Sequence, residues 1–243
     1  MIRSMSSALA IVLLPGLGQA AAPPFVFGSA SVFNDATQLV IHITRACTEG
    51  NLIQVVAVST HGQKKMIKAF DSGGVNVYQS GGGKWFRGAI DGTFLATTSP
   101  GEPTNAGLHP PATITVTYSD GALWKAAIAA CVPGLETRYG SADNKAGVSP
   151  AFGDGASIDL TPSPNVSRRD EPLFVATVLI GDAADHWTES AGYKTLMTLQ
   201  SRNTLNLAYQ IIPGVTPTHY HATNSAARLW SAANRSYKTP LKP

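Results

Sequence analysis

The sequence predicts an all-β protein, folded as a single large antiparallel β-sandwich or jelly-roll-like domain behind an apolar N-terminal segment. Of the 243 residues, 44% are apolar and only 14% are charged, which excludes a disordered chain because disorder requires low hydrophobicity and high charge. Turn signals such as Asp120-Gly121 and Pro213-Gly214 recur at short intervals, and no long amphipathic helical pattern lies between them. About ten short strands with this spacing are typical of a sandwich or jelly roll.

The first 23 residues have a character of their own. Arg3 is followed by an apolar run over residues 8–14, a Pro-Gly break and a small-residue tract over residues 19–22. This layout is typical of a secretory signal peptide, and the apolar run is too short to span a bilayer. The alternative is an apolar arm that docks on a partner subunit. We therefore divide the chain into this segment (1–23), a β-sandwich domain (24–238) and a C-terminal tail (239–243).

Two unbroken apolar runs predict buried strands. Residues 52–58 and 173–180 are rich in β-branched types, as expected for strands buried on most of both faces. Residues 113–118 and 205–211 alternate between apolar and more polar side chains, which predicts half-buried strands. The other predicted strands are 25–33, 38–44, 64–70, 84–90, 123–132 and 228–237. Residues 140–169 are rich in Gly, Ser and Pro and predict a long crossover loop.

A Tyr-then-Trp pattern occurs twice, each time after one of the apolar runs. Tyr118 precedes Trp124, Tyr220 precedes Trp230, and each Trp follows a Leu. The pattern indicates either an internal duplication, with one half per sheet, or the general likeness of sandwich strands to one another. We expect both tryptophans, which lie within predicted strands, to pack in the core.

Cys47 and Cys131 are the two cysteines of the chain. An even count in a chain with a signal-like start favours one disulfide, which would stabilise the fold by roughly 4–5 kcal/mol in the chain-entropy model. The alternative is a pair of buried free thiols that pack as small apolar residues. No C-x-x-C motif or Cys/His cluster indicates a zinc site.

Four stretches resemble a family of uncharacterised β-sandwich proteins that occur in proteobacterial genomes and their phages. They are ACTEGNLI (46–53), DSGGVNVY (71–78), LAYQI (207–211) and LWSAA (229–233). The first is similar to the family's small-Cys-x-x-Gly-Asp-Leu-Ile element and the second to its Asp-Ser-x-Gly-Asn-x-Tyr element. Asn51 stands where the family has Asp, and an extra residue separates Gly74 from Asn76. The resemblance spans roughly residues 24–238 and implies a structural or adhesive module, often encoded among phage particle genes.

The sequence contains no identifiable catalytic motif. A G-x-S-x-G elbow, a phosphate-binding loop and a dinucleotide fingerprint are all missing, so we expect a non-enzymatic protein without a cofactor. Trp85, Trp187 and Tyr193 are candidate binding residues, either as a sugar-stacking patch or as core residues. His219 and His221 lie two apart and could share a metal on one strand face, with His186 or Asp185 as a third ligand. Two surface histidines beside a buried Tyr220 are the simpler interpretation.

These observations lead to two functional expectations. The first is a phage virion surface component, a head decoration or tail-associated protein, that contacts neighbouring virion proteins or further copies of itself. The second is a secreted bacterial protein, periplasmic or extracellular, that binds a surface glycan. We expect no nucleic-acid partner, because the net charge is only +3 and no basic stripe follows the chain. We also expect no membrane span, because the apolar run near the N-terminus is too short.

Overall fold

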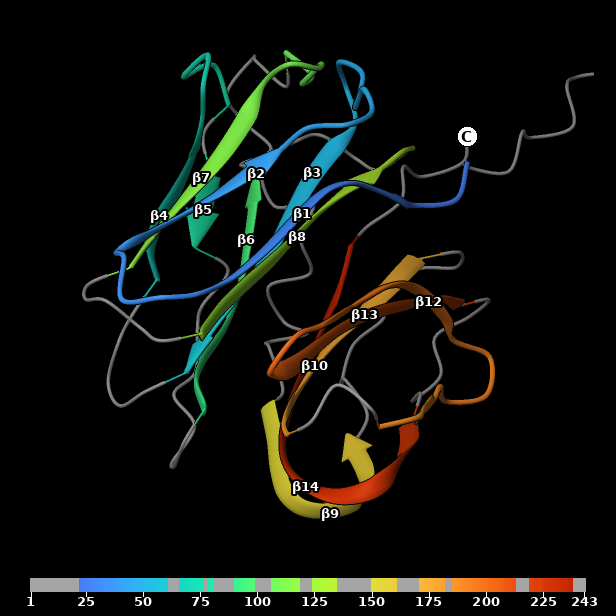
Figure 1. Ribbon diagram of the computed structural model, residues 1–243. Coiled ribbons are helices and arrows are strands. Elements are labelled where there is room, and N and C mark those ends of the chain that lie inside the picture. The colour runs from blue at the N-terminus through green and yellow to red at the C-terminus, as the bar shows by residue number, and fades with distance from the viewer. Residues whose placement is uncertain are drawn as a thin grey trace, which may run out of the picture.

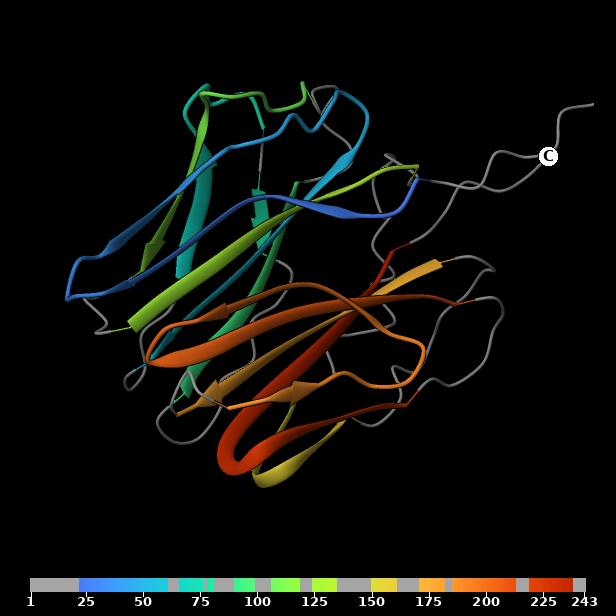
Figure 2. The ribbon, with the colours of Figure 1, turned by 45° about the vertical axis from the view of Figure 1, so that its right-hand side comes forward.

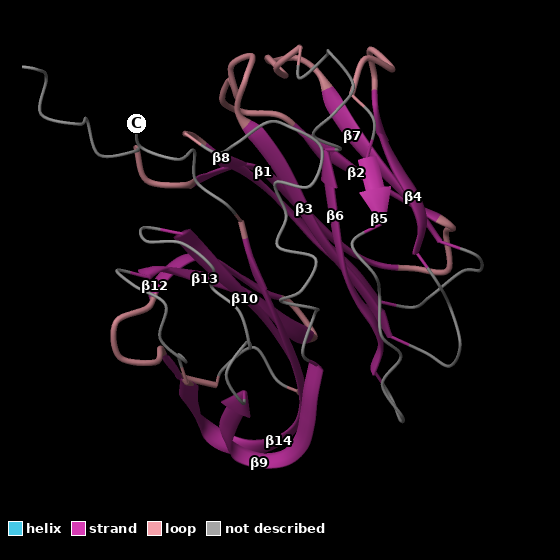
Figure 3. Ribbon diagram, turned by 180° about the vertical axis from the view of Figure 1, so that it is seen from behind, coloured by secondary structure: helices cyan, strands magenta, loops and turns pink. Residues whose placement is uncertain are grey.

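The computed structural model describes residues 22–60, 66–76, 78–80, 90–98, 106–118, 124–134, 150–160, 171–181, 185–212 and 219–237. In this part of the chain every regular element is a strand (Figures 1 and 3), which confirms the predicted all-β sandwich class. No helix among these residues is long and apolar enough to cross a membrane. Trp85, most of the N-terminal segment 1–23 and the tail 239–243 lie outside the described residues.

The strands fall into two halves that follow one another along the chain. The N-terminal half contains β1 (Phe25–Phe33), β2 (Gln38–His42), β3 (Leu52–Thr60), β4 (Met66–Asp71), β5 (Tyr78–Ser80), β6 (Ile90–Thr98), β7 (Thr113–Tyr118) and β8 (Trp124–Val132). The C-terminal half contains β9 (Pro150–Leu160), β10 (Glu171–Ile180), β11 (Trp187–Thr188), β12 (Lys194–Gln200), β13 (Asn203–Ile212) and β14 (Tyr220–Ser236). All of the pairings between these strands are antiparallel.

The two halves have the same strand topology. In the N-terminal half, a five-stranded sheet β1-β8-β3-β6-β5 faces a three-stranded sheet β2-β7-β4. In the C-terminal half, the order β9-β14-β10-β13-β12 repeats the five-stranded sheet. The long strands β9 and β14 bend (Figure 1), so the end of β9 and the start of β14 join β11 in the positions of β2, β7 and β4. Each half is therefore a sandwich in itself, whereas the duplication predicted from the sequence had one half per sheet.

The two tryptophans of the repeated sequence pattern are not equivalent in this topology. Trp124 belongs to the core cluster that joins the two halves, whereas Trp230 belongs to the core inside the C-terminal half. Strands β8 and β14 occupy corresponding positions in the two halves, but their Trp side chains point to opposite faces of the sheets. Both tryptophans are buried, as expected. A shift of one position along a strand places a residue on the opposite face of the sheet, and this explains why the two side chains lie in different cores.

The five-stranded sheets of the two halves pack face to face (Figure 2). Leu52, Val56 and Val58 of β3 meet Phe174, Ala176 and Val178 of β10 in one shared core cluster. The opposite face of β3, with Ile53, Val55 and Ala57, packs on the three-stranded sheet of its own half. Strand β3 is therefore buried at every residue, because its sheet has another layer on each side. This explains why residues 52–58 lack the polar alternation of an outer strand.

Three sequence predictions need correction. Strand β9 lies inside the predicted loop 140–169, and β14 begins at Tyr220 instead of residue 228. Residues 205–211 are predicted to form a half-buried strand, but β13 is buried on both faces over Asn203–Tyr209. Only Ile211, near the end of this strand, is exposed. The Gly-rich sequence of β9 concealed a strand because it packs closely on a large side chain. A Cβ atom at Gly153 would lie 2.7 Å from the ring of Trp230, so the strand excludes a side chain there.

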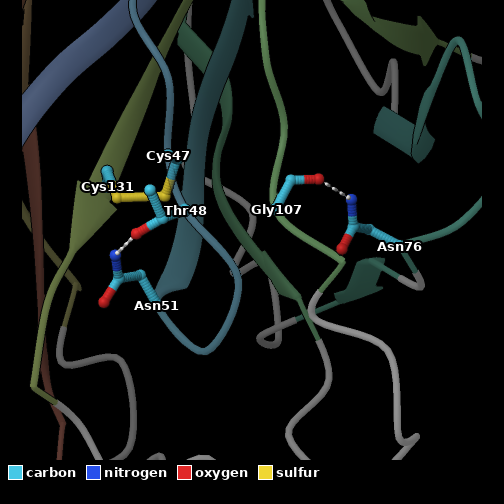
Figure 4. The surroundings of a disulfide bond; sticks show 6 residues. All are labelled: Cys47, Thr48, Asn51, Asn76, Gly107 and Cys131. Carbon is cyan, nitrogen blue, oxygen red and sulfur yellow. Dashed lines mark hydrogen bonds between the residues drawn. A yellow bond between two sulfur atoms is a disulfide. The ribbon is translucent and has the colours of Figure 1, made fainter.

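A disulfide joins Cys47 to Cys131 (Figure 4). Cys47 lies in the loop between β2 and β3, and Cys131 lies near the end of β8. Both residues are fully buried in the core of the N-terminal half. The backbone of Cys47 also exchanges two hydrogen bonds with Leu108, at 2.9 and 2.8 Å. The bond therefore fastens the loop that connects the two sheets of this sandwich to the five-stranded sheet.

Replacement of both cysteines by alanine removes this cross-link without leaving a lone thiol. The two residues are 84 positions apart, so we expect the free energy of unfolding to fall by about 4–5 kcal/mol. Equilibrium urea denaturation of the wild type and of Cys47→Ala/Cys131→Ala, each with and without reductant, measures the effect. Reductant should weaken the wild type and leave the double variant unchanged. Equal stability of the wild type in both conditions would contradict a stabilising disulfide.

Candidate functional site

A hydrogen-bond network around the carboxylate of Glu189 is the candidate site. Glu189 lies between β11 and β12, next to the core of the C-terminal half. Its Oε2 atom accepts hydrogen bonds from Trp187 Nε1 at 3.3 Å, Thr195 Oγ1 at 2.9 Å and Asn206 Nδ2 at 3.1 Å. Its Oε1 atom accepts one from the backbone N–H of Ser190 at 3.2 Å. The carboxylate thus connects its own segment to β12 and β13.

The sheet of the C-terminal half orients these donors. Asn206 is fully buried on β13 and lies opposite Thr177 of β10. The hydroxyl of Thr198 donates to Asn206 Oδ1 at 2.7 Å, which leaves the amide N–H group of Asn206 to donate to Glu189. Trp187 is held from the other side, because β11 pairs with the start of β14 at Asn224.

Two tyrosines lie beneath this network. Tyr193 and Tyr220 are buried, and their rings meet edge to face with centroids 4.9 Å apart. Burial, and then the negative charge of Glu189, raise the pKa of the Tyr220 hydroxyl far above its usual value. That hydroxyl is therefore protonated at physiological pH and does not serve as a base. It faces Glu189 and Thr177, but no acceptor lies within hydrogen-bond geometry of it.

The geometry suits fastening and binding better than catalysis. With three donors on one oxygen, the carboxylate has little remaining capacity to take a proton from a substrate. Its Oε1 atom has one donor in the described structure and keeps capacity for another. The partly exposed ring of Trp187 lies beside it. Together they offer an apolar face with an adjacent acceptor, the combination that suits amphipathic ligands.

The structure brings together two of the three predicted binding residues. Trp187 and Tyr193 belong to the surroundings of Glu189, while Trp85 is outside the described residues. Sequence reasoning missed Glu189, Thr195 and Asn206. The first two lie within a few residues of Trp187, but Asn206 reaches the site only through the pairing of β12 with β13. No periodicity in the sequence marks that contact.

The two histidines of the weak metal prediction have different surroundings. His221 pairs across the strands with Asp159 of β9, and its Nδ1 lies 2.5 Å from Asp159 Oδ1. His219 is exposed and precedes β14. Within the described ranges, no three side chains among His, Cys, Asp and Glu are arranged to hold a metal ion. The histidine–aspartate contact is a cross-strand surface pair.

Asp185, the other suggested ligand, is tied to a cation. Arg228 Nε and Nη2 donate to its two oxygens at 2.7 and 3.1 Å, and Asn224 Nδ2 donates at 3.0 Å. The hydrogen bond from Arg228 is the main reason why the pKa of Asp185 is lowered to about 2. The pair connects the segment before β11 to β14.

Removal of the charge of Glu189 should weaken the C-terminal half. In Glu189→Gln, the three groups that donate to the Oε2 atom would meet a neutral amide instead of a carboxylate. We therefore expect the free energy of unfolding to fall by about 1.5–3 kcal/mol. Urea denaturation measures the change. Glu49→Gln is the matched control, because Glu49 is exposed in the loop before β3. Equal stability of the two variants would show that the Glu189 network does not fasten the fold.

The Asp185–Arg228 pair predicts a pH dependence of stability. The pKa of Asp185 in the folded protein, about 2, is below its ordinary value of 3.8, so the unfolded chain binds the proton first as the pH falls. The stabilisation is therefore complete above the ordinary value and is lost as the pH falls towards 2. Melting temperatures from pH 7 to pH 2 should place the wild type above Asp185→Asn at neutral pH. The two curves should converge at the acid end, and a constant gap would contradict the pair's role.

Comparison with known proteins adds no family to this geometry. No family model matches the chain, no curated protein matches its sequence, and no solved structure matches its fold.

Proposed function

We propose that this chain is a non-enzymatic structural protein of a phage virion surface, either a head decoration or a tail-associated protein. The observation that carries the proposal is the use of the Glu189 carboxylate. This carboxylate accepts four internal donors and fastens a surface segment to the sheet. A rigid sandwich that withstands assembly needs such fastening, whereas a catalyst needs a carboxylate with free capacity.

An apolar row on the outer sheet of the N-terminal half supports contacts with neighbours. Val40 of β2 and Phe70 of β4 each pair with Thr115 of β7. These three residues therefore share one face. The side chains of Val40 and Phe70 are each 40% exposed. Directly opposed side chains on one sheet face form a continuous surface, and a virion component would bury it against adjacent proteins or a second copy of itself.

The disulfide supports a location outside the reducing cytoplasm. Disulfides persist in oxidising surroundings, which include virion surfaces, the periplasm and the extracellular space. The buried Cys47–Cys131 bond is therefore compatible with both the virion proposal and the second candidate, an exported glycan-binding protein. The partly exposed Trp187 next to the carboxylate of Glu189 favours the second candidate, because aromatic rings with neighbouring polar groups bind amphipathic ligands such as sugars.

One experiment separates the two candidates. Particles and periplasmic or culture fractions are purified from the organism that encodes the chain, and the intact mass of the protein is measured without reductant. We expect the protein in the particles, at a mass that includes the N-terminal segment and lacks the two hydrogens of free thiols. Absence from the particles, combined with loss of about 20 N-terminal residues, would contradict the virion proposal and favour export.

A further inference from the structure

The interface between the two halves contains polar atoms that the fold leaves without partners. The shared core is otherwise apolar. Four buried side chains at this interface carry a polar atom with no hydrogen-bond partner, namely Gln54, Ser231, Arg235 and Tyr237. Buried polar groups are normally hydrogen-bonded to protein or to a bound species. A cluster of exceptions at one interface therefore needs a physical explanation.

Arg235 is the most demanding of the four. It lies on β14 opposite Phe174, which places its side chain on the face that packs against the N-terminal half. Its exposed fraction is only 8%, and its Nη1 atom has no acceptor. The sole described contact of the guanidinium is with the ring of Tyr237, at 5.6 Å from the centroid. A buried charge is normally paired, because desolvation without a counter-charge is strongly unfavourable.

The surrounding groups are donors as well. Burial raises the pKa of Tyr237 to about 12, even though the charge of Arg235 opposes the shift, so its hydroxyl carries a proton at neutral pH. This hydroxyl has no partner. Gln54 projects from β3 on the facing surface, between Leu52 and Val56, and both of its amide atoms are unpartnered. The described groups thus offer one guanidinium, one hydroxyl and one amide N–H group as donors, together with the carbonyl oxygen of Gln54 as a neutral acceptor, so none of them supplies a counter-charge.

The strand pairing next to Arg235 is incomplete among the described residues. The pairing of β9 with β14 ends at Pro150 and Ala233, two residues before Arg235. Beyond that point, no described strand pairs with β14 on the side away from β10. Arg235 is therefore not enclosed by a described strand on this side of β14.

We infer that Arg235 is the centre of an oxyanion-binding site between the two halves, with the Tyr237 hydroxyl as a neighbouring donor and Gln54 as a further donor on the facing sheet. The planar guanidinium fork matches the paired oxygens of a phosphate, a sulfate or a carboxylate. A bound oxyanion would supply the missing counter-charge and would join the two sandwiches. This inference does not depend on whether the protein belongs to a virion or is exported.

Ligand-dependent thermal stability of the full chain tests the site. Melting temperatures of the wild type and of Arg235→Gln are recorded in low-millimolar phosphate, sulfate or acetate, against chloride of equal ionic strength. We expect a saturable rise for the wild type and an affinity weakened roughly tenfold or more in the variant, since a hydrogen bond from a charged donor is lost. A response to phosphate and sulfate alone identifies a tetrahedral oxyanion, and a response to acetate identifies a carboxylate.

Two further variants keep the test decisive. Arg202→Gln is the charge-matched control, because Arg202 is exposed and its guanidinium lies over Phe33; it should respond like the wild type. Tyr237→Phe preserves the ring and its packing on Phe174 and removes only the hydroxyl, so it should bind several-fold more weakly even if Arg235→Gln fails to fold. No saturable rise in the wild type, or equal rises in the wild type, Arg235→Gln and Tyr237→Phe, would overturn the inference.

Discussion

Burial of the central strands of two five-stranded sheets on both of their faces is the constraint on which the structure depends. Each sheet has its own three-stranded partner on one side and the other half of the molecule on the other side. Strands β3 and β8 are consequently buried at every residue. Small side chains make this possible, since Ala126, Ala130 and Ala176 lie in the shared core. In a tightly packed interior, such small residues allow facing layers to approach.

The same constraint decides where polar groups can be used. Inside the C-terminal half, Glu189 is satisfied by donors from three neighbouring segments, so the charged group strengthens the attachment of its loop. Between the halves, Arg235 has no comparable acceptor among the described residues. The two sites therefore differ in chemistry: the Glu189 carboxylate has four internal donors, whereas Nη1 of Arg235 has no acceptor within the described protein.

The repeated topology determines which surfaces of the protein are free for contacts. Two equivalent sandwiches share a core, and the disulfide closes the N-terminal one. The apolar row of Val40 and Phe70 lies on the outer sheet, away from the shared core. This row is an exposed apolar surface on the side of the N-terminal half that faces away from the C-terminal half. The partly exposed Trp187 lies on the other half, at a distance from this row along the chain.

The sequence by itself determined the all-β class, the apolar strands around residues 52–58 and 173–180, and the alternation of β7, in which Ile114, Val116 and Tyr118 are buried. These features depend on local patterns of hydrophobicity, which the chain carries regardless of its neighbours. Only the tertiary structure decided that β9 is a strand, because its Gly-rich sequence is explained by the packing of Trp230 on Gly153. It also decided that Trp124 and Trp230 face different cores and that Asn206 reaches Glu189. Such contacts join residues that are distant in the chain, and they depend on strand register, which a short sequence pattern does not specify.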